Sequence, residues 1–298
     1  MNEYHVKAFA KINLGLDVIN KMPNGYHQVK MIMQSIGLYD ELTLQKTDSG
    51  ITISTDSDLL PTDQNNLIRK AAEIMYDKHH ITSGVHIHLK KNIPIAAGMA
   101  GGSTDAAAAL KGIDILFGLN IPLSRLAEYA VSIGADVPYC LLGGTALAEG
   151  IGERLTPLPA IPDCYILVAK PDIMVSTKFV YEQLDARPFR HPDIDGMTEA
   201  IQTGNLSGIL SRMENVLESV TIPAYPVIED LKKQMLCLGA AASLMSGSGP
   251  TVFGIFPTKQ AQAAHKALEH FQSSPLAKEV FLVRRADNQT PMDAVPTP

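Results

Sequence analysis

The glycine-rich segment at residues 94–110, PIAAGMAGGSTDAAAAL, constrains the fold more than any other part of this chain. It lies between a strand-like run and an alanine-rich helical run. Gly98, Gly101 and Gly102 let the backbone turn tightly and approach an anion, because no Cβ blocks the way. A helix beginning near Ser103 would point its free N–H groups and positive dipole end at this loop. The segment therefore predicts a phosphate-binding site.

The spacing of this segment differs from two common nucleotide-binding loops. It does not match the Walker A pattern G-x-x-x-x-G-K-[ST], and it lacks the dinucleotide pattern G-x-G-x-x-G. We therefore expect the loop to hold a nucleoside triphosphate within a different fold.

Composition narrows the class of protein. The 298 residues are enough for one large or two ordinary domains, and 46% hydrophobic with 19% charged residues is typical of a globular protein with a sizeable core. The net charge of −6 argues against a general nucleic-acid or anionic-membrane surface. No apolar leader or long apolar run is present, so we expect a cytoplasmic protein without a membrane contact.

The cysteines and histidines predict no metal site. Cys140, Cys164 and Cys237 are far apart and form no C-x-x-C pair, which argues against a zinc site or a disulfide framework. The histidines at 79, 80, 86 and 88 have no carboxylate or cysteine at ligand spacing.

Hydrophobic periodicity predicts strands and helices in mixed order. The expected strands cover residues 4–18 (one long bent strand or a pair), 36–45, 51–54, 85–89, 141–147, 165–169, 242–245, 252–256 and 279–284. The expected helices cover residues 66–78, 104–117, 123–133, 177–184, 194–203, 206–212, 226–238 and 261–271. This order predicts an α+β protein rather than a regular βαβ series.

Prolines at 157, 159 and 162 mark a candidate domain boundary. We expect an N-terminal domain over residues 1–160, a C-terminal domain over residues 161–286 and a frayed, proline-rich tail over residues 287–298.

Two polar pairs lie in strand or turn contexts outside the glycine-rich loop. Lys11 and Asn13 share one face of a strand, where they either hold and polarise a substrate or form a solvated strand edge. Tyr26 and His27 follow a turn, and they either frame a planar ring or pack in the core.

Asp136 and a second glycine-rich loop are further candidates. Asp136 follows a helix-ending glycine and lies two residues before a proline, so it is either a general base or a turn or cap aspartate. In the segment SGSGPT, Gly247 and Gly249 permit close approach to a ligand or another loop, or they form a tight hairpin.

The order of these motifs resembles the GHMP kinase superfamily. The segments that carry the resemblance are AKINL at 10–14, GYH at 25–27, the loop at 94–104, GADVP at 134–138 and SGSGPT at 246–251. It extends over residues 7–256 and implies a two-domain α+β fold. The N-terminal domain would be ribosomal-protein-S5-like and the C-terminal domain ferredoxin-like, with the substrate cleft between them.

The resemblance also implies a reaction. The Lys11 and Asn13 motif followed by residues 25–27 is most similar to members that phosphorylate the 2-hydroxyl of 4-diphosphocytidyl-2-C-methyl-D-erythritol in non-mevalonate isoprenoid synthesis. Asp136 matches the catalytic base of the family and Lys11 its catalytic lysine. The co-substrate would be ATP with Mg²⁺, although no carboxylate dedicated to the metal is apparent in the sequence. The partners would be small molecules only, and the oligomeric state, monomer or dimer, stays open.

The resemblance assigns the remaining site residues by position. The ATP site would comprise Asn66, Lys91, Pro94, Ala97, Gly98, Met99, Ala100, Gly101, Gly102, Ser103 and Thr104. The cytidine site would comprise Asn13, Tyr26, His27 and an aromatic ring that stacks on cytosine, for which Tyr181 is the best match and Phe179 the alternative.

Three loop positions depart from the common family pattern. They are Met99 in place of leucine, Ala100 in place of glycine and Thr104 in place of serine. Ala100 is the informative one, because its side chain predicts a negative φ at that position.

Two rival functions follow from the same residues. Another kinase of the superfamily would keep the phosphate loop but have no use for Tyr26 and His27 in a cytosine pocket. A non-catalytic nucleotide-binding protein of this fold would be expected to lack Lys11 or Asp136, and both are present.

Overall fold

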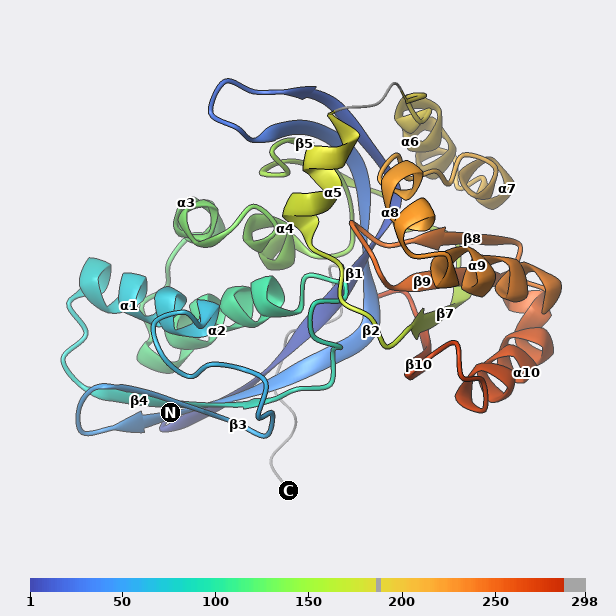
Figure 1. The fold of residues 1–298 in the computed structure, drawn as a ribbon. Helices are drawn as coiled ribbons and strands as arrows, with labels where there is room; N and C mark the ends of the chain where they lie inside the picture. The colour runs from blue at the N-terminus through green and yellow to red at the C-terminus, as the bar shows by residue number, and fades with distance from the viewer. Residues whose placement is uncertain (186–188, 287–298) are drawn as a thin grey trace.

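The computed structural model describes residues 1–185 and 189–286, so the predicted tail at 287–298 lies outside the described residues. Two β-sheets organise the chain, one built mainly from each half (Figure 1). The predicted α+β class is confirmed.

The N-terminal sheet is built on a long antiparallel pair. Its strands are β1 (Glu3–Lys21), β2 (His27–Thr47), β3 (Ile51–Thr55), β4 (Gly84–Lys90), β5 (Thr145–Gly150) and β6 (Arg154–Leu158). They lie in the order β3-β4-β2-β5-β6 with β1 paired to β2, and the β3–β4 pair is parallel. The stretch at 4–18 is thus one long strand, and the expected strand at 36–45 is the second half of a longer one.

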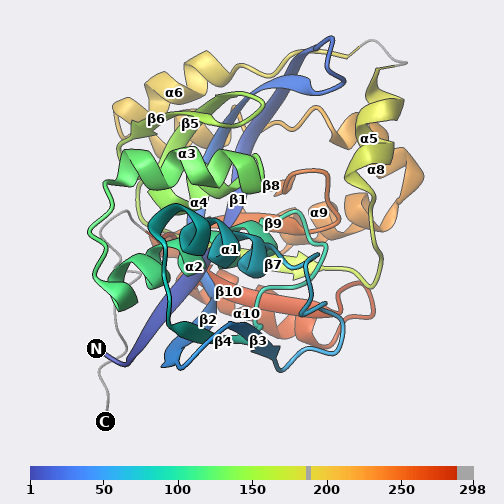
Figure 2. The same cartoon turned by 90° about the vertical axis from the view of Figure 1, so that its left-hand side faces the viewer.

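Four helices cover one face of this sheet, nearest the viewer in Figure 2. They are α1 (Leu67–His79), α2 (Gly101–Phe117), α3 (Leu123–Ile133) and α4 (Val137–Leu142). The small side chains of α2 allow a close approach to the sheet: a Cβ at Gly112 would lie 2.7 Å from a methyl carbon of Leu44 on β2. This packing holds α2 against the sheet, and the phosphate loop ends where α2 begins, at Gly101.

The C-terminal sheet is antiparallel throughout, in the order β10-β7-β9-β8. Its strands are β7 (Cys164–Lys170), β8 (Ala242–Met245), β9 (Val252–Pro257) and β10 (Glu279–Arg284). The helices of this half are α5 (Thr177–Leu184), α6 (Ile194–Gln202), α7 (Leu206–Leu210), α8 (Glu218–Ala224), α9 (Val227–Cys237) and α10 (Ala261–Gln272), with a short 3₁₀ turn η1 (Thr258–Gln260). A bridge between Ile36 and Arg285 joins the end of this half to β2.

The sequence prediction was wrong at residues 141–147, and it missed several elements or parts of elements, including the first half of β2 and helix α4. Residues 141–147 were expected to be one strand, but α4 ends at Leu142 and β5 begins at Thr145. Pro138 is in the first turn of α4, and Gly143 and Gly144 have positive φ and break the run. The short apolar run therefore belongs to two elements. Strand β6 and helix α8, which contains Pro223, were not predicted.

No helix within residues 1–185 and 189–286 combines the length and apolarity that crossing a membrane requires.

Candidate functional site

The glycine-rich loop turns through three residues with left-handed backbone conformation. The φ angles are +53° at Ala96, +70° at Gly98 and +58° at Ala100, and α2 begins at Gly101. The expectation of a negative φ at Ala100 was therefore wrong. Ala100 is the N-cap of α2, and its carbonyl accepts a hydrogen bond from Thr104 N at 2.9 Å, so the loop must turn into the helix at this residue.

The second glycine-rich loop, residues 246–251, touches the first. Ser246 Oγ donates a hydrogen bond to the Gly98 carbonyl at 3.0 Å. A Cβ at Gly98 would lie only 2.4 Å from the Ser246 carbonyl oxygen. Gly98 is therefore required both for its φ and for the contact between the loops, and the expected close approach of the two loops is present.

Lys11 and Asn13 lie on β1 beside these loops. The pairing of β1 with β2 shifts register between Phe9 and Lys11 and again between Asn13 and Gly15. Such irregularities re-aim side chains and are common next to active sites. Lys11 is 4% exposed and Asn13 is fully buried. The Lys11 ammonium donates to Asn13 Oδ1 at 2.7 Å and to the Gly98 carbonyl at 3.2 Å, which excludes the solvated-edge alternative for this pair.

Asp136 lies opposite Lys11, in the turn between α3 and α4. Gly134 ends α3 and Val137 begins α4, so Asp136 is held between two helices. Its side chain is 32% exposed and makes no capping hydrogen bond to α4. The distance from Lys11 Nζ to Asp136 Oδ2 is 3.9 Å. The capping alternative for Asp136 is thus not supported.

Two cavities meet at the phosphate loop. The larger, about 690 Å³, is bordered by Lys11, Asn13 and Asp136 and extends to Tyr26, His27 and Tyr181. The smaller, about 340 Å³, is bordered by the loop, by Asn66 and Lys91, and by the apolar residues Leu60, Pro61, Leu67 and Leu89. Gly98, Ala100 and Ser103 border both cavities. The phosphate loop therefore lies between the two cavities, and both cavities reach these three loop residues.

An aromatic cluster borders the far end of the larger cavity. The rings of His27 and Tyr181 are 4.7 Å apart and tilted by 36°. His27 Nε2 lies 2.8 Å from Asp185 Oδ1, which fixes the imidazole. Burial, with a smaller contribution from Asp136, raises the pKa of the Tyr181 hydroxyl. Tyr181 borders the cavity, whereas Phe179 is not among the residues that line it, so Tyr181 is the better placed of the two rings.

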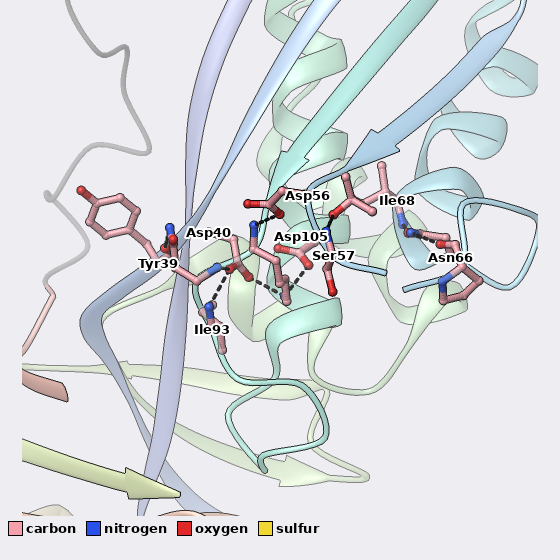
Figure 3. A network of polar contacts seen from close by, with 12 residues as sticks. Tyr39, Asp40, Asp56, Ser57, Asn66, Ile68, Ile93 and Asp105 are labelled. Carbon is pink, nitrogen blue, oxygen red and sulfur yellow. Dashed lines mark hydrogen bonds and ion pairs between the residues drawn. The ribbon is translucent and has the colours of Figure 1, made fainter. Parts of the chain in front are cut away.

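The side chains of Asn66 and Lys91, both predicted to bind ATP, are bonded to other groups of the protein. Asn66 Oδ1 accepts from Ile68 N at 2.9 Å, capping α1, and Asn66 Nδ2 donates to the Pro61 carbonyl at 2.7 Å (Figure 3). The Lys91 ammonium lies between Asp40 and Asp105, at 2.5 and 2.8 Å. Both residues border the smaller cavity, and the contacts predicted for them with a nucleotide stay a prediction.

Sequence reasoning missed Asp40, Asp105 and Asp185. Asp40 and Asp185 lie outside the family motifs. Asp105 directly follows the phosphate loop, and an acid inside an apolar helical run was a usable signal. Thr177 and Ser248, whose hydroxyl groups form a 2.8 Å hydrogen bond at the wall of the larger cavity, were missed because they are 71 positions apart in the chain.

The residues present fit a triphosphate. The loop backbone and the N-terminus of α2 form an anion cradle at Gly101, Gly102 and Ser103. Within residues 1–185 and 189–286, no group of three or more histidine, cysteine or acidic side chains is arranged to hold a metal ion.

Comparison with known proteins identifies the family. The model for the GHMP kinases N terminal domain matches residues 66–144, and that for GHMP kinases C terminal matches residues 197–273. The 4-diphosphocytidyl-2-C-methyl-D-erythritol kinase of Lachnospira eligens is 55% identical over 266 residues, which cover 89% of this chain and 92% of that protein. The chain belongs to this kinase family. The kinase of the same name from Lachnoclostridium phytofermentans is 52% identical over 95% of this chain and 98% of its own length.

Solved structures agree with this membership. A 4-(cytidine 5'-diphospho)-2C-methyl-D-erythritol kinase superimposes with a TM-score of 0.79 at 30% identity, covering 94% of this chain and 98% of that chain. A homoserine kinase from Cytophaga hutchinsonii has the same TM-score at 22% identity, covering 97% and 96%, and shows the shared fold alone. The resemblance drawn from the motifs is confirmed, and the protein is a kinase.

Proposed function

We propose that this kinase transfers the γ-phosphoryl group of ATP to the 2-hydroxyl of 4-diphosphocytidyl-2-C-methyl-D-erythritol, a step of non-mevalonate isoprenoid synthesis. The observation that carries the proposal is the junction of two cavities at Gly98, Ala100 and Ser103, beside Lys11 and Asp136. A phosphoryl donor in one cavity and an alcohol in the other would meet there. The names of the relatives support this choice of alcohol.

The smaller cavity suits the nucleotide. Its apolar end, formed by Leu60, Pro61 and Leu67, fits a purine ring, and its other end is the phosphate loop. Phosphoryl transfer depends mainly on in-line positioning and on stabilisation of charge, which oriented backbone N–H groups provide. Bound ATP would supply the phosphoryl group, and an accompanying Mg²⁺ would offset part of its negative charge.

Asp136 and Lys11 would act on the alcohol. The Asp136 side chain borders the larger cavity and makes no capping hydrogen bond to α4, so its carboxylate can accept the proton of the attacking hydroxyl. Lys11, almost fully buried and held by Asn13 and Gly98, places its ammonium 3.9 Å from this carboxylate. In that position the ammonium would stabilise the substrate oxygen as it becomes nucleophilic.

The aromatic cluster would bind the cytidine end. We expect Tyr181→Ala to raise the KM for the cytidyl substrate roughly tenfold or more, because stacking of a base on an aromatic ring is worth about 1–3 kcal/mol. Tyr181→Phe keeps the ring and is the matched control. Steady-state kinetics with each substrate varied in turn would check this. An equal rise in KM for ATP, or no difference between the two variants, would contradict the assignment.

The proposal as a whole is tested by the choice of alcohol. Purified protein would be assayed for ADP release with 4-diphosphocytidyl-2-C-methyl-D-erythritol, mevalonate and homoserine. We expect turnover with the cytidyl compound alone, and competition by cytidine nucleotides against that substrate. Turnover with mevalonate or homoserine would refute the substrate while retaining the kinase.

A further inference from the structure

A buried cluster of three ionisable side chains lies behind the phosphate loop. Lys91 Nζ contacts Asp40 Oδ2 at 2.5 Å and Asp105 Oδ2 at 2.8 Å. The exposed fractions of these side chains are 6% for Lys91, 0% for Asp40 and 4% for Asp105. Burying charges is costly unless each one is closely compensated, so this triad is expensive for the fold to retain.

The triad joins both ends of the phosphate loop to β2. Asp40, on β2, also accepts hydrogen bonds from the backbone N–H groups of Asn92 and Ile93, at 2.6 and 2.7 Å, immediately before the loop (Figure 3). Asp105 is in the first turns of α2, immediately after the loop. A Cβ at Gly101, the first residue of α2, would lie 2.9 Å from Lys91 Nζ, so the ammonium also lies directly against the loop exit.

The loop between these ends holds a conformation that its residues disfavour. Ala96 and Ala100 both have φ in the left-handed region, at +53° and +58°. Alanine adopts this region only when the surroundings enforce it. Ser246 and Lys11 hold the middle of the loop through the Gly98 carbonyl. The fixed ends at residues 92–93 and 101–105 constrain the loop from both sides.

We propose that Asp40, acting through Lys91 and the N–H groups of residues 92 and 93, is a positioning residue that holds the phosphate loop in its ATP-binding shape. The inference rests on the proposed function, because it takes the loop to bind ATP. It assigns the Lys91 ammonium to the loop rather than to the nucleotide.

The two carboxyl groups of the triad are not equivalent. Asp40 accepts three hydrogen bonds, whereas Asp105 Oδ1 is buried and has no partner within residues 1–185 and 189–286. Burial, together with the charge of Asp40, raises the pKa of Asp105 well above its usual range, although Lys91 opposes the shift. Asparagine at position 105 is therefore a close substitute for the aspartate. At position 40 the NH₂ group of an asparagine would face the Lys91 ammonium or the N–H groups of residues 92 and 93, which are all donors.

The test compares buried and exposed charges at adjacent positions. Asp40→Asn and Lys91→Met remove triad members. Their matched controls are Glu41→Gln and Lys90→Met, which break the neighbouring exposed pair, Lys90 Nζ to Glu41 Oε1 at 2.9 Å. Calorimetry would give the Kd of ATP without any alcohol present. Kinetics would then give the KM for ATP and for the alcohol separately.

We expect both triad variants to weaken ATP binding at least tenfold, with the KM for the alcohol changed less than twofold and both controls close to wild type. Asp105→Asn should lose at least fivefold less affinity than Asp40→Asn. Adding Ala96→Gly and Ala100→Gly should raise the ATP affinity of the Asp40→Asn protein more than it changes the ATP affinity of wild type. The reason is that glycine adopts the left-handed loop conformation without help from its surroundings.

Three results would overturn the inference and make the triad a stability element only. The first is an unchanged Kd for ATP with a lowered melting temperature in the triad variants. The second is an equal loss of ATP affinity in the exposed controls, and the third is failure of both triad variants to fold. Wild-type protein that binds no ATP would refute this inference and the proposed function together. Wild type that binds ATP but does not phosphorylate the cytidyl alcohol would refute the proposed substrate and leave the loop result to decide the inference.

Discussion

Replacing Asp136 with asparagine is expected to lower kcat about 10²–10⁴-fold, the usual contribution of a positioned general base. The substitution keeps the size of the side chain and its place between α3 and α4, but an amide cannot accept the proton of the attacking hydroxyl. The partner ammonium of Lys11, 3.9 Å away, would remain in place through its bonds to Asn13 and Gly98. ATP binding should therefore persist.

The measurement is single-turnover phosphoryl transfer together with the Kd of ATP. Asp172→Asn is the matched control, because that carboxylate is 73% exposed and pairs with Lys278 on the surface of the C-terminal half. A kcat within threefold of wild type for Asp136→Asn would rule out the base role and leave positioning by the loop as the main source of catalysis.

The second large effect is expected from Gly98→Ala. The added Cβ would lie 2.4 Å from the Ser246 carbonyl oxygen and 3.1 Å from that of Gly249, both backbone atoms that cannot rotate away. The φ of +70° adds a cost of about 1–2 kcal/mol for a residue with a Cβ. With overpacking of a further 1–3 kcal/mol or so, we expect the loops to separate and most activity to be lost.

Gly118→Ala separates the two contributions. Gly118 has almost the same φ, +66°, but an added Cβ there would have no atom within 4 Å. Denaturant unfolding should show a loss of about 1–2 kcal/mol for Gly118→Ala and a larger loss for Gly98→Ala, with activity retained only in the former. Equal destabilisation of the two variants would mean that backbone conformation, rather than the loop contact, makes Gly98 necessary.

Local pattern was sufficient for most elements and for the loop. The helix expected at 104–117, the strands near 85–89 and 252–256, and the turn glycines all follow from periodicity and backbone freedom, which are properties of neighbouring residues. The same reasoning failed at 141–147 because a short apolar run fits a buried helix as well as a buried strand. It also failed at Ala100, where a fixed loop enforces a φ that alanine by itself disfavours.

The motifs of the sequence determined the family and nominated Lys11, Asn13, Asp136 and Tyr181, because those residue types lie in recognisable segments. Only the tertiary structure decided which candidate side chains lie close together and which are bonded to other protein groups. It brought Lys11 from β1 within 3.9 Å of Asp136 from the α3–α4 turn, and it enclosed Lys91 between Asp40 and Asp105. Contacts between distant segments depend on how whole elements pack, and no local window of sequence contains that information.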